Sequence, residues 1–115
     1  MKKIYYLKTC DTCKRILNQL NLDGFEIQEI KSNPVNAEQL QEMYALTNSY
    51  EELFNKRARL YKEQGLKDKN LSEEDYKNYI LSEYTFLKRP VAIIENEIFV
   101  GNSKKTVEAL IAKTQ

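Results

Sequence analysis

Hydrophobic residues change their spacing twice within the first thirty residues. Residues 2–7 (KKIYYL) form a short run rich in β-branched and aromatic side chains, which predicts a strand. From Cys13 the apolar residues fall at helical spacing until the stop and turn signal Asp23-Gly24: Ile16, Leu17, Leu20 and Leu22. Residues 25–30 (FEIQEI) then alternate apolar and polar, which is the period of a strand. The start of the chain therefore predicts a strand, a helix and a second strand.

Helical patterns occupy the middle of the chain. After the break at residues 32–34 (SNP), Asn36 with Gln39 resembles a capping pair, followed by the apolar stripe Leu40, Met43, Tyr44 and Leu46. We expect a short helix around residues 50–55 and then a polar stretch, rich in lysine and arginine, up to residue 70. Ser72 with Asp75 predicts the start of another helix, with the stripe Tyr76, Tyr79 and Ile80.

The last third predicts a hairpin and a closing helix. Residues 91–94 (VAII) suit a buried strand, residues 95–97 (ENE) a tight turn, and residues 98–100 (IFV) the returning strand. An amphipathic helix is expected over residues 103–113. The order is β-α-β, a helical middle, then β-β-α. This is the layout of an α/β, thioredoxin-like fold with a central helical insertion, and the C-x-x-C lies where such folds place their reactive cysteine.

Composition narrows the class of protein further. The 115 residues are the size of one domain, and 42% hydrophobic residues are enough for a core. Lys plus Arg (18) nearly cancels Asp plus Glu (17), so direct nucleic-acid binding is not expected. No apolar run is long enough to span a bilayer, and polar residues interrupt the N-terminus too early for a signal peptide. We therefore expect a cytoplasmic protein with reduced thiols.

Histidine is absent, which removes the commonest general base and a common metal ligand. Any catalysis must therefore rest on Cys, Arg, Lys, Tyr or carboxylate side chains. The only two cysteines, Cys10 and Cys13, allow three interpretations. Half of a zinc site would need two more ligands, which carboxylates alone seldom supply. Two inert, buried thiols are the second interpretation, although the flanking residues (KTCDTCK) suggest a polar turn rather than an apolar face.

The third interpretation, a redox site, has a physical mechanism. A thiol at a helix N-terminus faces unpaired N–H groups and the positive end of the helix dipole, and both stabilise the thiolate. Lys14 and Arg15 add positive charge nearby. We therefore expect Cys10 to have a pKa below the usual value and to act as the nucleophile, with Cys13 as a possible resolving thiol. A C-x-x-C beside a βαβ pattern favours this chemistry.

Four motifs recur in one order over essentially the whole chain: IYYLKTCDTCKRIL, LFNKRARLYKEQGL, LKRPVAII and FVGNSKKTV. Together they resemble the arsenate reductase (ArsC)-like family, which includes the Spx regulators and the YffB-type proteins. The resemblance implies a single thioredoxin-fold domain over residues 1–115. In the arsenate-reducing members one cysteine attacks the oxyanion, three arginines hold it, and glutathione with glutaredoxin completes the reduction.

The resemblance also assigns roles to residues. Cys10 matches the nucleophile and Arg89 matches one of the arginines, whereas Asn55 and Gly101 stand where the reductases have the other two. Thioredoxin folds commonly place a cis-proline before this strand, so we expect the Arg89–Pro90 bond to be cis. An ordinary proline at the start of a strand is the alternative. Further substrate-binding candidates are Arg57, Thr12 and Lys14, and the tyrosines expected near the site are Tyr6 and Tyr61.

The sequence thus predicts a thiol-dependent oxidoreductase for a small anionic or thiol substrate. The resemblance implies glutathione or glutaredoxin as electron donor, with no bound cofactor and no metal. We expect a monomer that acts away from membranes. The alternative is an Spx-type redox-sensing regulator that uses the C-x-x-C as a switch and binds RNA polymerase through its α subunit. A third possibility is a member that keeps the fold and the thiols for another binding role.

Overall fold

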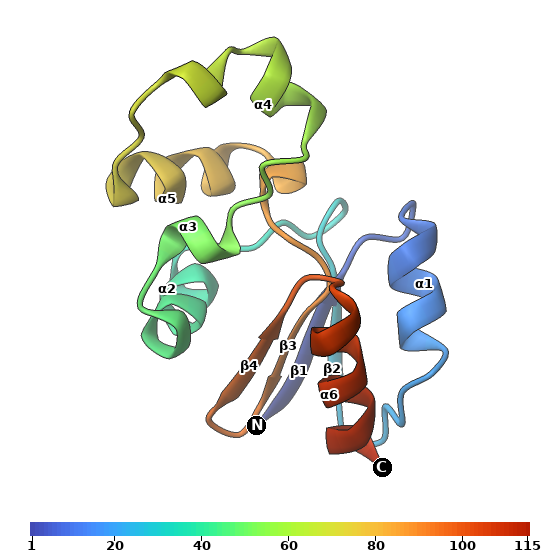
Figure 1. Cartoon of the computed structure of the whole chain (residues 1–115). Helices are drawn as coiled ribbons and strands as arrows, with labels where there is room; N and C mark the ends of the chain where they lie inside the picture. Colours follow the sequence, from blue (N-terminus) through green and yellow to red (C-terminus); the bar gives the residue numbers. More distant parts are fainter. The chain divides into compact units, whose positions relative to one another are not determined.

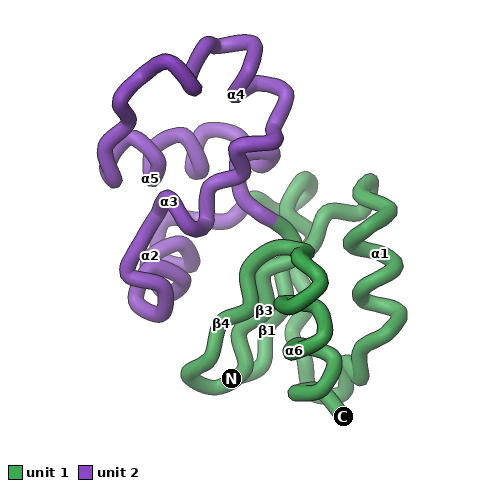
Figure 2. The backbone as a smooth tube through the Cα atoms, in the orientation of Figure 1, with its two compact units in different colours: residues 1–34, 89–115 green, residues 35–88 purple.

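The chain divides into two compact units (Figure 2). The first unit is made of two segments that are distant in the sequence. The computed structural model describes residues 1–115, of which residues 1–34 and 89–115 form unit 1 and residues 35–88 form unit 2. None of the helices combines the length and the apolar character needed to cross a membrane. That the whole chain behaves as a single domain stays a prediction.

Unit 1 contains a four-stranded mixed sheet with the strand order β2-β1-β3-β4 (Figure 1). Strand β1 runs parallel to β2 and antiparallel to β3, and β3 runs antiparallel to β4. This topology and the element order confirm the predicted thioredoxin-like fold. The elements of unit 1 are β1 (Lys2–Tyr6), α1 (Asp11–Leu17), β2 (Glu26–Glu29), β3 (Val91–Ile94), β4 (Glu97–Val100) and α6 (Lys104–Thr114).

One face of the sheet packs against α6 and the C-terminal end of α1. Its buried core joins Ile4 of β1 and Ala92 of β3 to Leu110 of α6. Partly buried side chains complete this core: Leu17, Leu20, Leu22, Phe25 and Phe99. In β3 the core residues Ala92 and Ile94 are two apart, because successive side chains in a strand point to opposite faces of the sheet. The whole of β3 is buried, as its continuous apolar sequence predicts.

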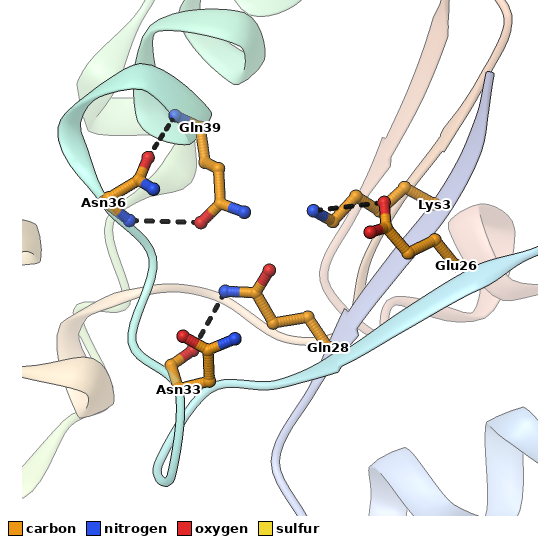
Figure 3. Close-up of polar contacts among 6 residues, drawn as sticks. All are labelled: Lys3, Glu26, Gln28, Asn33, Asn36 and Gln39. Carbon is orange, nitrogen blue, oxygen red and sulfur yellow. Dashed lines mark hydrogen bonds and ion pairs between the residues drawn. The ribbon is translucent and has the colours of Figure 1, made fainter.

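Polar contacts fix the pairing of β1 with β2 (Figure 3). Lys3 is only 9% exposed; its ammonium lies 3.4 Å from the carboxylate of Glu26, its register partner, and 5.0 Å from the centre of the Tyr5 ring. The Gln28 amide donates to the carbonyl of Asn33 at 2.9 Å and so holds the turn after β2. An opposite-charge pair directly across two strands favours one register over its neighbours.

Unit 2 consists of helices and loops, with one isolated antiparallel bridge between Phe54 and Leu87. Both predicted capping pairs are present as reciprocal capping boxes, Asn36 with Gln39 at the start of α2 (Figure 3) and Ser72 with Asp75 at the start of α5. The α-helices of unit 2 are α2 (Ala37–Thr47), α3 (Tyr50–Leu53), α4 (Arg59–Glu63) and α5 (Glu73–Ser82), and its 3₁₀ helices are η1 (Leu66–Asp68) and η2 (Tyr84–Phe86).

The stretch up to residue 70, expected to be merely polar, contains α4 and η1. Its sequence carries neither a capping pair nor an apolar stripe. Helix α4 has no buried residue, and Ala58 before it has no side-chain hydrogen bond to the first turn. The apolar anchor of η1 is Leu66, which is buried.

An aromatic cluster forms the centre of unit 2. The ring of Phe54 is fully buried, with Tyr76 at 5.0 Å and Phe86 at 5.1 Å between ring centres. Tyr61 and Tyr79 pack on the same ring. Aromatic pairs at these separations contribute packing beyond the area they bury. Tyr61, expected near the reactive cysteine, therefore has a packing role in unit 2.

Candidate functional site

Cys10 lies between the end of β1 and the first residue of α1. Its backbone N–H donates to the carbonyl of Leu7 at 3.1 Å, and its own carbonyl accepts from Lys14 at 3.2 Å. The first bond closes the turn after the strand, and the second begins the hydrogen-bond ladder of the helix. Cys10 is partly exposed and is a free thiol. The strand–helix junction thus places Cys10 at a partly exposed position.

Cys13 lies inside the first turn of α1 and is fully buried. The expectation that both cysteines occupy a polar turn is therefore wrong for Cys13. Cys13 and Ile16, one helical turn later, are the two buried residues of α1. Residues three apart share one face of a helix, and this face turns inward. Cys13 is a free thiol as well.

Arg89 reaches the cysteines because of the sheet topology. The antiparallel register pairs Val91 with Tyr5, so the residues before β3 lie beside the loop that follows β1. The Arg89 guanidinium acts on the thiol of Cys10 and lowers its pKa. The Arg89–Pro90 peptide bond is cis, as predicted. The carbonyl of Pro90 accepts from the N–H of Gly101 at 2.9 Å. This bond joins the residue after β4 to the residue before β3.

The surroundings of Cys10 favour its thiolate. Burial acts to raise its pKa, but the backbone N–H and thiol of Cys13 and the charged, hydrogen-bonding guanidinium of Arg89 outweigh burial and hold the pKa below the usual value. Lys14 and Arg15, whose charges the sequence suggested for this effect, lie exposed in the last turn of α1. The positive charge at the sulfur comes instead from Arg89, at the entrance of β3.

Cys13 titrates in the opposite direction. Burial raises the pKa of its thiol to about 12, and the neighbouring Cys10 sulfur adds to the shift through its charge and hydrogen bond. A hydrogen bond from the backbone N–H of Leu7 and the charge of Arg89 oppose the shift without cancelling it. The surroundings therefore favour the thiolate at Cys10 and the protonated thiol at Cys13.

The remaining predicted residues are distributed over both units. Thr12, partly exposed, and Lys14, exposed, lie on α1 next to the cysteines. Tyr6, partly exposed, is the last residue of β1. Arg57 is an exposed residue of unit 2, and its participation in substrate binding stays a prediction. No three His, Cys, Asp or Glu side chains are grouped so that they could hold a metal ion.

Asn55 is hydrogen-bonded within unit 2 through its backbone N–H and through both polar atoms of its side chain. Its backbone N–H donates to the carbonyl of Phe86 at 2.7 Å, and its side-chain Nδ2 donates to the carbonyl of Thr85 at 3.3 Å. Its Oδ1 accepts from the N–H of Arg57 at 3.0 Å. The amide of Asn55 therefore connects its own loop to η2.

Glu29 was not among the residues singled out from the sequence. Its carboxylate accepts hydrogen bonds from the loop that leads to Cys10 and from the turn after β2. A signal was available, since the alternation of FEIQEI leads one to expect an apolar residue at position 29.

Fold and site together define a thioredoxin-like protein with a paired-cysteine site, and comparison with known sequences gives its family. The sequence model of the ArsC family matches residues 5–110, so the chain belongs to the ArsC family. It is 26% identical to YfgD of Escherichia coli (strain K12) over 113 residues, which cover 95% of each chain. It is 28% identical to YusI of Bacillus subtilis (strain 168) over 102 residues, covering 84% of this chain and 86% of that one.

A solved structure agrees with this assignment. The arsenate reductase from Vibrio cholerae superimposes with a TM-score of 0.74 at 19% sequence identity, over 99% of this chain and 97% of that chain. At this identity the likeness establishes the fold, and the chemistry has to be argued from the residues present.

Proposed function

We propose that this protein is a thiol-dependent oxidoreductase of the arsenate reductase-like type, in which Cys10 is the nucleophile and Cys13 the resolving thiol. Membership of the ArsC family and the likeness to arsenate reductase structures support a thiol oxidoreductase-like function. The observation that carries the proposal is the placement of the two thiols, with Cys10 partly exposed at the start of α1 and Cys13 buried in its first turn. This placement lowers the pKa at Cys10 and raises it at Cys13. A thiolate beside a protonated thiol is the arrangement that attack followed by resolution requires.

With a disulfide substrate, the Cys10 thiolate attacks one sulfur and forms a mixed disulfide, while the other sulfur leaves as a thiolate and takes up a proton. Cys13 then loses its proton and attacks the Cys10 sulfur, which releases the second substrate thiol. Two electrons and two protons pass to the substrate, and a Cys10–Cys13 disulfide remains. Two molecules of glutathione, or the dithiol of a glutaredoxin, return the pair to the reduced state.

With arsenate, the Cys10 sulfur bonds to arsenic(V) and one oxygen leaves as water after protonation. A second thiol, Cys13 or glutathione, attacks the Cys10 sulfur. The S–As bond breaks, its electron pair stays on arsenic to give arsenite, and a disulfide forms. Arg89 offers a guanidinium for the anion in either reaction, and Arg57 is the second candidate.

Cys13 changes character during the proposed cycle. Part of the rise in its pKa comes from the charge of Cys10 and from their shared hydrogen bond. Both causes disappear when the Cys10 sulfur enters a covalent bond, so the pKa of Cys13 falls at the stage when it must act. Burial, the largest cause, persists and keeps Cys13 protonated and unreactive toward other oxidants in the resting protein.

Two positions argue that arsenate is one candidate substrate among others. Asn55, at one arginine position, has its amide engaged with Thr85 and Arg57, and Gly101, at another, has no side chain. We therefore propose a broader substrate class of small oxyanions and thiol-derived disulfides, with glutathione or glutaredoxin as donor. A reducing, cytoplasmic compartment would supply these donors.

The test compares the natural protein with Cys10→Ser in a coupled assay that follows NADPH consumption through glutathione reductase, with glutathione and glutaredoxin present. Arsenate and the mixed disulfide of glutathione and cysteamine are the two substrates. Activity with either substrate that is lost in Cys10→Ser supports the proposal. No activity with both would overturn it and favour a regulatory role. Binding to RNA polymerase would then be examined by pull-down, with and without oxidant, using the carboxyl-terminal domain of its α chain.

A further inference from the structure

The carboxylate of Glu29, the last residue of β2, connects two loops of unit 1. Its Oε2 accepts from the backbone N–H of Lys8 at 2.9 Å. Its Oε1 accepts from the Ser32 N–H and hydroxyl, both at 2.8 Å, and from the Lys31 N–H at 3.1 Å. Burial acts to raise the pKa of Glu29, but these donors outweigh it and lower the pKa. The carboxylate is therefore ionised, and both its oxygens are engaged, throughout the neutral pH range.

The bond to Lys8 acts on the peptide group that positions Cys10. The N–H of Lys8 and the carbonyl of Leu7 belong to the same peptide unit, which is trans. In a planar trans peptide these two groups point in opposite directions, so fixing one fixes the other. The carbonyl of Leu7 is the acceptor for the Cys10 N–H. Glu29 thus holds one side of a peptide plane whose other side holds Cys10.

The same loop contacts the second cysteine. The backbone N–H of Leu7, on the preceding peptide, opposes the rise in the pKa of Cys13. Rotation of the Leu7–Lys8 peptide plane would take the Leu7 carbonyl away from the N–H of Cys10. The bond to Glu29 ties this peptide to the end of the neighbouring strand β2.

We propose that Glu29 is a positioning residue for the nucleophile: it orients the Leu7–Lys8 peptide and thereby holds the Cys10 sulfur against the Cys13 N–H and the Arg89 guanidinium. The proposal rests on the proposed function, in that Cys10 must be the reactive thiolate. It adds a residue of β2 that touches neither cysteine. A serine or glycine at this place would leave the loop without its acceptor.

Charge and position make opposite predictions for Glu29, and this makes the proposal testable. A nearby negative charge disfavours a thiolate, so removing the charge alone would lower the pKa of Cys10. Loss of orientation weakens the contacts that stabilise the thiolate, so the pKa of Cys10 would rise. In Glu29→Gln only one carbonyl oxygen remains for two loops, and an NH₂ group faces the other set of donors. Glu29→Asp keeps the charge but is too short to reach both loops.

The experiment measures the rate of iodoacetamide alkylation of Cys10 against pH, with the site identified by mass spectrometry in the otherwise natural protein. Glu26→Gln is the matched control, because it removes the same charge from the same strand and Glu26 bonds to Lys3 rather than to the loop. We expect Glu29→Gln and Glu29→Asp to slow alkylation at pH 7 by about three- to tenfold, with rates converging at alkaline pH. Glu26→Gln should match the natural protein.

The possible outcomes separate this proposal from the proposed function. A natural protein whose Cys10 pKa is not below the usual value contradicts the proposed function. A lowered Cys10 pKa that stays unchanged or falls further in Glu29→Gln overturns the positioning role and leaves the proposed function intact. If circular dichroism shows that both Glu29 variants are unfolded, the contact is tested in the natural protein by NMR. Its Lys8 amide resonance should then titrate with the Glu29 carboxyl, below the usual glutamate pKa, and a Lys8 amide that ignores this titration contradicts the contact.

Discussion

The thiol and the backbone N–H of Cys13 both act to lower the pKa of Cys10, and the charge on Cys10 in turn helps to raise the pKa of Cys13. One residue thus stabilises the anion of its neighbour and is kept protonated by it. The two titrations are therefore linked, and a change at either cysteine should appear at the other.

Replacing Cys13 should raise the pKa of Cys10 by an amount that depends on the new side chain. Cys13→Ala removes the thiol donor and keeps the backbone donor, whereas Cys13→Ser keeps a hydroxyl donor in its place. We expect alkylation of Cys10 at pH 7 to slow several-fold in the alanine variant and less in the serine variant. Equal rates in both variants would show that the thiol of Cys13 contributes nothing to the thiolate.

The charge of Arg89 should matter more than any charge on α1. Arg89→Gln removes the positive charge and keeps hydrogen-bond donors, so we expect a higher Cys10 pKa and alkylation at pH 7 slowed by about three- to tenfold. Arg89→Lys should lie between this variant and the natural protein, because it keeps the charge without the planar fork. Arg15→Gln is the control, since Arg15 is exposed in the last turn of the helix. An equal effect of Arg15→Gln would show that positive charge on α1, rather than Arg89 in particular, lowers the pKa of Cys10.

Protein stability should carry the pH signature of Cys10. Its pKa is lower in the folded protein than in the unfolded chain, where it is about 8.5. The stabilisation is therefore fully present above the unfolded value and is lost as the pH falls through the folded value. In urea unfolding at several pH values, the free energy of unfolding of the natural protein minus that of Cys10→Ser should rise with pH across this window. A flat difference would contradict the lowered pKa.

Local chemistry explains what the sequence could predict of the fold. The capping boxes that begin α2 and α5 need only residues three apart, and both were recognised from Asn36 with Gln39 and Ser72 with Asp75. Helix α4 lacks a capping side chain and a buried stripe, so its sequence resembles an ordinary polar loop. It is helical in the context of unit 2, which a propensity argument does not contain.

The sequence predicted the site residues that belong to a motif. It did not predict those whose role depends on contacts with residues distant in the sequence. The spacing of the cysteines and the motif around Arg89 were visible in the sequence, and the cis bond followed from the fold. The burial of Cys13 was not visible in the sequence, because its sequence neighbours are polar, whereas in the structure its side chain is buried. The contacts of Glu29 and Asn55 were missed because their partners, Lys8 and Thr85, are 21 and 30 residues away.

Asn55 should prove to be a stabilising residue of unit 2. Asn55→Ala loses the side-chain bonds to Thr85 and Arg57, so we expect a loss of about 1–2 kcal/mol in the free energy of unfolding by urea. Asn102→Ala, at an exposed position, is the control and should change the free energy little. Asn55→Arg should be destabilised as well, because it loses the same two bonds. An unaffected Asn55→Ala would show that the connection is dispensable.

Glu73 should stabilise a helix other than its own. It is the first residue of α5, and its two carboxylate oxygens accept from the backbone N–H groups of Tyr50, at 2.7 Å, and Glu51, at 3.2 Å, which begin α3. We expect Glu73→Ala to lower the free energy of unfolding by about 1–2 kcal/mol, since it leaves two donors of a four-residue helix unpaired. Glu74→Ala, an exposed neighbour in the same turn, is the control. Comparable losses in the two variants would point to α5 itself.

Unit 1 is built from residues 1–34 and 89–115, and this division has a consequence for the newly synthesised chain. While the ribosome is still making unit 2, β1 has only β2 as a strand partner, because β3 has not yet been translated. Cys10 is translated before unit 2 and Arg89 after it. Until unit 2 has been made, the nascent chain therefore carries both cysteines without the guanidinium that lowers the pKa of Cys10.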